Sequence, residues 1–308
     1  HTRLQGDWSS DVCSSDLAAM ATVVLEDSQY KTYRLLDEKD QAEVRVVPER
    51  GGIVTHWQVQ GEEIFYLDGE RFKDPNLSVR GGIPLLFPIC GNLVNDTYTV
   101  QGQPYCLPQH GFGRSLPWTV THQSGGDRAS LTVTLTSDAS TRAVYPFDFT
   151  LDYTYTLKGS SLELRQRHSN QSSQPMPFST GIHPYFRVDD KSQLAIDLPS
   201  TQYQVKGEPR IHNFDGNFDF DQEEIDFAFI NLTGRSATVS DRTRQLRLKL
   251  EFDHHYSTLV FWAVKGKDFY CLEPWTGPRN ALNTGAHLLT IAPGDSLETV
   301  ITMTVEKL

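Results

Sequence analysis

Strict alternation of apolar and polar residues is the feature that most constrains how this chain can fold. It is clearest in residues 147–159, FDFTLDYTYTLKG, where apolar or aromatic side chains occupy every second position. Because successive side chains of a strand point to opposite faces, this stretch predicts an antiparallel strand with one buried and one solvated face. Residues 130–137 and 245–252 repeat the pattern, and residues 296–307 repeat it more weakly.

A continuous apolar run, LVFWAV at residues 259–264, predicts a further strand that is buried on both faces. Clusters of Gly, Pro, Asn and Asp separate the strand patterns, and no helical stripe extends beyond about two turns. The fold class expected is all-β, a large antiparallel β-sandwich. The sequence has 308 residues, and residues 20–308 are expected to form a single domain of this kind.

The first 19 residues, HTRLQGDWSSDVCSSDLAA, do not fit this pattern. They contain neither the basic start nor the apolar stretch of a secretory signal. They resemble translated adaptor or vector sequence fused ahead of a natural start at Met20. Residues 1–19 are therefore expected to be a foreign leader without native structure.

The charge and the cysteine content limit the possible binding partners and the cellular compartment of the protein. The formal net charge is −11, which argues against a nucleic acid or an anionic membrane as partner. No apolar run approaches the ~18 residues needed to span a bilayer. Three cysteines follow the leader, at irregular spacing and without metal-binding motifs, which predicts reduced thiols, a cytoplasmic location and neither metal nor cofactor. A monomer or weak homodimer is expected.

Four short blocks interrupt the strand pattern with reactive side chains beside glycine or proline. They are VRGGIPLLFPICGN (79–92) with Arg80, LPQHGFGRSLPW (107–118) with His110 and Arg114, STGIHPYFRV (179–188) with His183 and Tyr185, and FYCLEPWTGPRN (269–280) with Glu273 and Trp275. Taken singly, each has an ordinary structural explanation, such as a surface arginine, a satisfied histidine or the end of a strand.

Taken together, the blocks indicate a binding site. Each reactive side chain stands at a strand end marked by glycine or proline, and such ends gather at the rim or concave face of a sandwich. Aromatic faces with a few polar groups suit a sugar ring, which stacks through its C–H faces and hydrogen-bonds through its hydroxyls. The aromatic residues beside the blocks are Phe112, Trp118, Tyr185, Phe186 and Trp275.

These blocks resemble the galactose mutarotase-like family of aldose 1-epimerases, and especially its hexose-6-phosphate mutarotase branch. The matching residues are Arg80-Gly-Gly-Ile-Pro, His110-Gly-Phe-Gly-Arg114, His183-Pro-Tyr-Phe and Glu273-Pro-Trp. They occur in the family's order and spacing, and the similarity runs from about residue 25 to the C-terminus. The family fold is a large antiparallel β-sandwich, in agreement with the strand pattern.

The resemblance implies an isomerase that interconverts α and β anomers by acid–base ring opening, without metal or cofactor. The resemblance makes Glu273 the base and His183 the acid. Because His183 must donate a proton near neutral pH, its pKa is expected to lie near 7. Substrate-binding roles fall to His110 and to a further set of residues: Arg80, Arg114, Tyr185 and Trp275. Arg80 matches an arginine that binds the 6-phosphate in phosphosugar members. PICGN departs from the phosphosugar pattern, so a free aldose and its 6-phosphate both stay open.

Two other functions compete with the epimerase. One is a non-catalytic carbohydrate-binding β-sandwich module, which needs the aromatic residues but not the pair of Glu273 and His183. The other is a glycoside hydrolase, which needs two carboxylates about 5–10 Å apart. Only Glu273 stands in a motif, and the acidic residues of 214–226 are expected to form a solvated loop.

Overall fold

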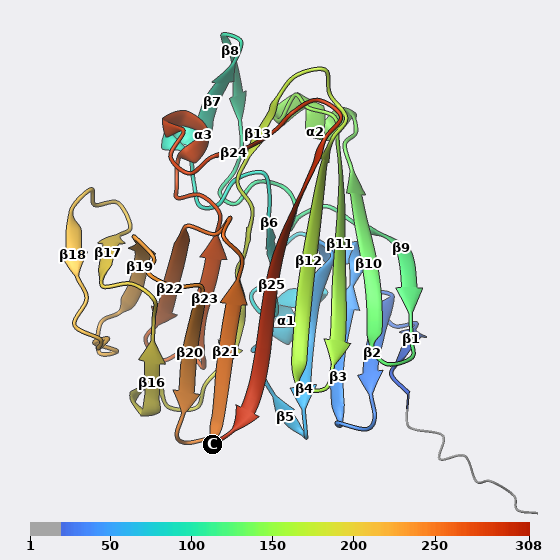
Figure 1. Ribbon diagram of the computed structural model, residues 1–308, viewed down its shortest axis with the longest axis vertical. Coiled ribbons are helices and arrows are strands. Elements are labelled where there is room, and N and C mark those ends of the chain that lie inside the picture. The colour runs from blue at the N-terminus through green and yellow to red at the C-terminus, as the bar shows by residue number, and fades with distance from the viewer. Residues whose placement is uncertain (1–19) are drawn as a thin grey trace, which may run out of the picture.

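The computed structural model describes residues 20–308, which form two layers of antiparallel sheet (Figure 1). The expected foreign leader, residues 1–19, lies outside the described residues. Short helices connect the strands: α1 (Gly69–Lys73), α2 (Ala139–Val144) and α3 (Ala281–Thr284), with 3-10 turns η1 (Pro48–Arg50), η2 (Val94–Asp96) and η3 (Lys191–Gln193). Between Met20 and the C-terminus, no helix has the length and apolar character to cross a membrane.

The first layer is an eight-stranded sheet in which every pairing is antiparallel. Its strands, from one edge to the other, are β16 (Leu194–Asp197), β20 (Ser236–Asp241), β21 (Leu246–Phe252), β25 (Ser296–Lys307), β12 (Ser161–Asn170), β11 (Phe149–Lys158), β10 (Ala129–Thr136) and β9 (Thr119–Ser124).

Two sheets form the second layer. A five-stranded sheet contains β1 (Thr22–Glu26), β2 (Thr32–Asp37), β3 (Ala42–Val47), β4 (Ile53–Val59) and β5 (Glu62–Glu63), and Figure 1 shows β2–β4 behind β10–β12. An eight-stranded sheet contains β18 (Ile211–Asn213), β17 (Gln202–Val205), β19 (Glu224–Ile230), β22 (Thr258–Val264), β23 (Phe269–Trp275), β14 (Gly181–Ile182) and β6 (Leu85–Leu86), with β15 (Tyr185–Arg187) paired to β23.

Two small ribbons lie beyond one end of the layers (Figure 1). They are β7 (Thr97–Val100) with β8 (Gln103–Cys106), and β13 (Met176–Phe178) with β24 (Leu289–Ile291).

Alternation in β11 creates the core between the layers. Every second side chain from Phe149 to Leu157 is fully buried, and the intervening side chains are partly exposed. The buried set packs with residues of the opposite layer such as Trp57 and Phe261. Burial of each large apolar side chain contributes about 1.5–3 kcal/mol, so this face drives the assembly of the two layers.

The other predicted strands are present as well. Residues 130–137, 245–252 and 296–307 correspond to β10, β21 and β25, and the expected all-β antiparallel sandwich is confirmed. Residues 259–264 lie in β22, but Trp262 and Val264 are only half-buried. The reason is that one face of β22 packs in the core while the other borders a cavity.

Candidate active site

Strand β23 carries Glu273 on the face of the second layer that points away from the core. Tyr270 and Leu272 belong to the core between the layers, so Cys271 and Glu273 face the other way. The sequence predicted that Glu273 would follow a strand, but it lies within β23, opposite Val260 of β22. Its side chain is buried among strands on both sides.

Trp275 fixes the direction of the Glu273 carboxylate. The two residues share a strand face, and the indole Nε1–H of Trp275 donates to Oε2 of Glu273 at 3.1 Å. A hydrogen bond to one oxygen leaves the other oxygen, Oε1, free to act elsewhere. The Glu-Pro-Trp motif therefore provides both a carboxylate and the group that orients it.

His183 meets Glu273 because its segment is paired to β23 on both sides. It lies between β14 and β15, and both of these strands pair with β23. Its Nε2 lies 3.2 Å from Oε1 of Glu273, and its ring stacks on Tyr185 with centroids 4.8 Å apart. The structure thus brings the predicted acid and base into direct contact.

His110 lies at the same place, in a turn with a left-handed backbone. Its φ is 65°, and its backbone N–H donates to Gly91 O at 2.7 Å. In return, the Gly91 N–H donates to Nδ1 of His110 at 2.8 Å. Because Nδ1 accepts, the proton of the neutral imidazole is assigned to Nε2. The ring centroid lies 5.6 Å from that of His183, so the site contains two imidazoles.

A cavity of about 250 Å³ brings the predicted site residues together. All seven lie on its wall: Arg80, His110, Arg114, His183, Tyr185, Glu273 and Trp275. The cavity is slightly smaller than the range of about 300–1,000 Å³ found for small-molecule sites, which suits a ligand with one ring. The roles of these residues remain predictions, but their convergence on one cavity is a finding.

Three of the aromatic residues expected beside the sugar lie elsewhere. Phe112, Trp118 and Phe186 are buried in the core between the layers. In β15, Phe186 points opposite to Tyr185 and packs on Tyr270 with centroids 5.3 Å apart. For Phe186 the prediction failed because adjacent residues in a strand face opposite ways. Phe112 and Trp118 lie in the turn segment before β9, and their side chains pack into the core and not toward the cavity.

Several wall residues were missed from the sequence, and Asp226 corrects a prediction. The acidic segment 214–226 was expected to be a solvated loop, but its last residues begin strand β19. Asp226 is half-buried and its Oδ1 lies 3.0 Å from Nη2 of Arg279. The alternation in EIDFAFI was the available signal. The charged and aromatic wall residues missed are Lys206, Glu224, Asp226, Trp262 and Arg279.

Burial dominates the protonation of the catalytic candidates. Loss of solvent, followed by the nearby Arg114, lowers the pKa of His183 to about 3. Burial raises the pKa of Glu273 well above its usual range. The expected pKa near 7 for His183 is therefore wrong, because desolvation outweighs the neighbouring carboxyl group. The free site favours a neutral carboxylic acid beside a neutral imidazole.

Burial also controls the protonation of His110. Burial, followed by the charge of a protonated His183, lowers its pKa well below the ordinary value. It is therefore a neutral donor at physiological pH, with its Nε2–H free for a ligand oxygen.

Cys271 adds a thiol beside the pair. Its sulfur, a nitrogen of His183 and a carboxylate oxygen of Glu273 lie within 4.8 Å of one another, a grouping that could in principle hold a metal ion. A metal would require a thiolate, and burial raises the pKa of this thiol well above its ordinary value. Without a metal ion the thiol is therefore protonated, and it adds no charge beside the pair.

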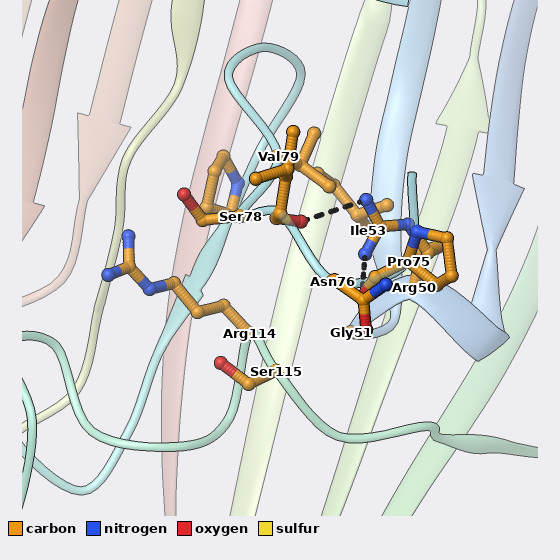
Figure 2. Close-up of a pocket in the computed structure, with 11 residues that line it drawn as sticks. Arg50, Gly51, Ile53, Pro75, Asn76, Ser78, Val79, Arg114 and Ser115 are labelled. Atoms are coloured by element: carbon orange, nitrogen blue, oxygen red, sulfur yellow. Dashed lines mark hydrogen bonds between the residues drawn. The ribbon is translucent and has the colours of Figure 1, made fainter. Parts of the chain in front are cut away.

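A second cavity, of about 270 Å³, adjoins the first (Figure 2). The two share Ser78, Val79 and Arg114, and Figure 2 shows the Arg114 side chain pointing away from Arg50. Nη2 of Arg50 donates to the carbonyl oxygens of Phe72, Asp74 and Leu77. These bonds hold the wall segment in place, so Arg114 lies between two formed cavities.

The antiparallel β-sandwich, with a cavity on the outer face of one layer, places the structure in the mutarotase-like class of proteins. The family model for aldose 1-epimerase matches residues 34–304, which is most of the chain. The chain therefore belongs to the aldose 1-epimerase family.

Known proteins agree with this assignment. The Slr1438 protein from Synechocystis sp. PCC 6803 is 42% identical, with a TM-score of 0.90 over 93% of this chain and 99% of that one. A galactose mutarotase-like protein from Clostridium acetobutylicum shares the fold, with 21% identity and a TM-score of 0.81 over 94% of this chain and 99% of that one. A protein of Escherichia coli (strain K12), provisionally named a glucose-6-phosphate 1-epimerase, is 30% identical over 149 residues, 48% of this chain and 46% of that protein.

Proposed function

We propose that this protein is an isomerase, an aldose 1-epimerase that interconverts the α and β anomers of an aldohexose or its 6-phosphate. The observation that carries the proposal is the buried contact of 3.2 Å between Nε2 of His183 and Oε1 of Glu273. Membership of the aldose 1-epimerase family supports the reaction class.

The reaction needs one base and one acid acting on two oxygens bonded to the same carbon. Glu273 takes the proton from the C1 hydroxyl while His183 gives a proton to the ring oxygen. The C1–O5 bond breaks, its electrons stay with the ring oxygen, and C1 becomes an aldehyde. Rotation about C1–C2 presents the other face, and the reverse transfers close the ring as the other anomer. Each positioned transfer contributes roughly 10²–10⁴ in rate.

The pair must carry one proton between its two members. Because burial lowers the pKa of His183 and raises that of Glu273, this proton rests on Glu273 in the free site. Transfer across the 3.2 Å contact gives the carboxylate and imidazolium that the ring-opening step uses. The pair titrates as a unit, so pH profiles report the pair and neither residue alone.

His110 and the aromatic residues hold the ring. The neutral His110 offers its Nε2–H to the ring oxygen or a neighbouring hydroxyl, because Nδ1 is occupied by Gly91. Tyr185, Trp262 and Trp275 line the cavity and provide faces for the C–H groups of a pyranose.

Arg80 and Arg114 are the candidates for binding the 6-phosphate group of a phosphorylated sugar. Both lie on the cavity wall, and Arg80 is exposed to solvent. A guanidinium grips phosphate through two parallel hydrogen bonds and would offset the acidic background locally. The provisional name of the Escherichia coli relative supports a phosphosugar as substrate.

A carbohydrate-binding module without catalysis is the second candidate. The aromatic wall would serve it equally well, but a binding site gains nothing from an acid and a base in contact. Two-dimensional exchange NMR on glucose and on glucose 6-phosphate separates the two. The epimerase accelerates exchange between anomer signals of at least one sugar, whereas acceleration of neither would refute the proposal.

Other expectations from the sequence are part of this proposal. We propose that residues 20–308 fold as one domain and act in the cytoplasm as a monomer or weak homodimer. The main core cluster contains residues of both layers, which supports one domain. Light scattering across a concentration series would reveal a stable larger assembly and contradict this.

A further inference from the structure

Arg279 contacts two other residues of the cavity wall, Asp226 and Trp275. Its Nη2 lies 3.0 Å from Oδ1 of Asp226, and its guanidinium carbon lies 5.1 Å from the centre of the Trp275 ring. Trp275 is the residue whose indole N–H binds Glu273. A continuous chain of contacts therefore runs from Asp226 to the catalytic carboxylate.

The aliphatic part of Arg279 packs on Gly91. A Cβ atom added at Gly91 would lie 2.3 Å from Cγ of Arg279, closer than side chains tolerate. The Gly91 N–H is the group that binds Nδ1 of His110. The same arginine thus contacts the ring that orients Glu273 and the backbone that orients His110.

This arrangement has an energetic cost. Nε of Arg279 is buried and has no hydrogen-bond partner among residues 20–308. Leaving a buried polar group unpaired is unfavourable. A buried polar group that stays unpaired in a folded protein needs an explanation. Because Arg279 lines the proposed site, a role in that site would provide one.

We infer that Arg279 is a positioning residue: it holds Trp275, and through it Glu273, and its balance with Asp226 sets the charge around the proton-sharing pair. The inference rests on the proposed function, because it assigns a role within the same site. It assigns no contact between Arg279 and the sugar.

The two members of the ion pair act in opposite directions on the catalytic groups. Arg279 lowers the pKa of both Glu273 and His183, whereas Asp226 raises the pKa of Glu273. Other titratable or charged groups also face the pair from the surrounding elements: Arg80, Cys90, His110, Arg114, Tyr185, Lys206, Glu224 and Cys271. These groups are common to all the variants below, so differences between the variants report Arg279 and Asp226.

Three substitutions separate geometry from charge. Arg279→Met removes both, and we expect kcat to fall about 10- to 100-fold with a smaller change in KM. It should move the alkaline limb of the kcat/KM profile, where the proton held by Glu273 is lost, to higher pH by about 0.5–2 units. Asp226→Asn also breaks the ion pair but should move that limb to lower pH. Arg279→Lys keeps the charge, so the profile should stay near that of the wild type while kcat is only partly recovered.

The matched control is an ion pair remote from both cavities. Arg142 and Asp148 are exposed partners, and neither lines either cavity. Arg142→Met and Asp148→Asn should leave the profile and kcat unchanged. A purely structural role for the Arg279–Asp226 pair predicts no shift, or the same shift for both broken pairs. Either result would overturn the inference.

A second readout keeps the inference separate from the proposed function. The Trp275 N–H is bonded to Glu273, so the Trp275 fluorescence should follow the protonation of the pair. Trp275→Phe identifies that component of the emission. If the wild type shows no epimerase activity but the fluorescence midpoints still shift in opposite directions, the function fails and the positioning role stands. If activity is present and the midpoints of Arg279→Met and Asp226→Asn coincide, the positioning role fails.

Discussion

Nε2 of His183 lies 3.2 Å from Oε1 of Glu273, although the two residues are far apart in the sequence. The contact arises because β14 and β15, on either side of His183, both pair with β23. Both side chains are buried, and the short distance leaves no room for a water molecule between the two atoms. Sheet register therefore places an acid and a base at the distance that a shared proton requires.

Removal of the Trp275 N–H should raise the pKa of Glu273 and leave its carboxylate less well oriented. In Trp275→Phe an aromatic ring remains against Arg279, but Oε2 of Glu273 loses its donor. Because this hydrogen bond lowers the pKa of Glu273, its loss raises that pKa further. The alkaline limb of the kcat/KM profile, where the proton held by Glu273 is lost, should move to higher pH, with a loss of about tenfold in kcat. An unchanged profile would mean that Trp275 does not orient the carboxylate.

Arg80 should discriminate between the two candidate sugars. Arg80→Ala removes an exposed guanidinium from the cavity wall, so glucose 6-phosphate should lose about 2–4 kcal/mol in kcat/KM. Glucose should be nearly unaffected, because it carries no charge to pair with the arginine.

Steady-state measurement of both sugars checks this, with Arg210→Ala as a control at an exposed arginine outside the two cavities. An equal loss on both sugars would remove the phosphate role of Arg80.

His168 should make the fold sensitive to acid. It is fully buried, and burial lowers its pKa to about 4. In the unfolded chain the pKa is about 6.5, so the folded state favours the neutral ring. The contribution to stability is complete above pH 6.5 and is lost as pH falls toward 4, by at most about 3 kcal/mol. His110 and His183, whose pKa values are also lowered, act in the same direction.

NMR titration of the histidine ring signals checks this prediction directly. The His168 signal should not titrate between pH 8 and 5, and urea midpoints should fall over the lower part of that interval. The exposed His122 serves as the internal reference. A midpoint near 6.5 for His168 would contradict the burial argument.

The alternating strands could be predicted because their information is local. The spacing of Phe149, Leu151 and Tyr153 is sufficient to define a strand face, and that face is buried. The blocks around His110, His183 and Glu273 were also visible, because glycine and proline mark the turns and the reactive residues stand beside them.

The ion pair of Asp226 with Arg279 was not visible, because it depends on the order of strands. β19 reaches β23 only through β22, and no local pattern states that order. The lowered pKa of His183 was also missed, since desolvation is produced by the packing of several distant segments. Long-range pairing and burial are thus the parts that the sequence did not reveal.

Glu273→Gln tests the central claim most directly. Glutamine keeps the size of the side chain and an oxygen for the Trp275 N–H, but it cannot accept the proton of the C1 hydroxyl. Exchange NMR should show anomer interconversion slowed about 10²- to 10⁴-fold relative to the wild type, while sugar binding by calorimetry changes little. Anomer exchange at the wild-type rate in this variant would contradict the acid–base account.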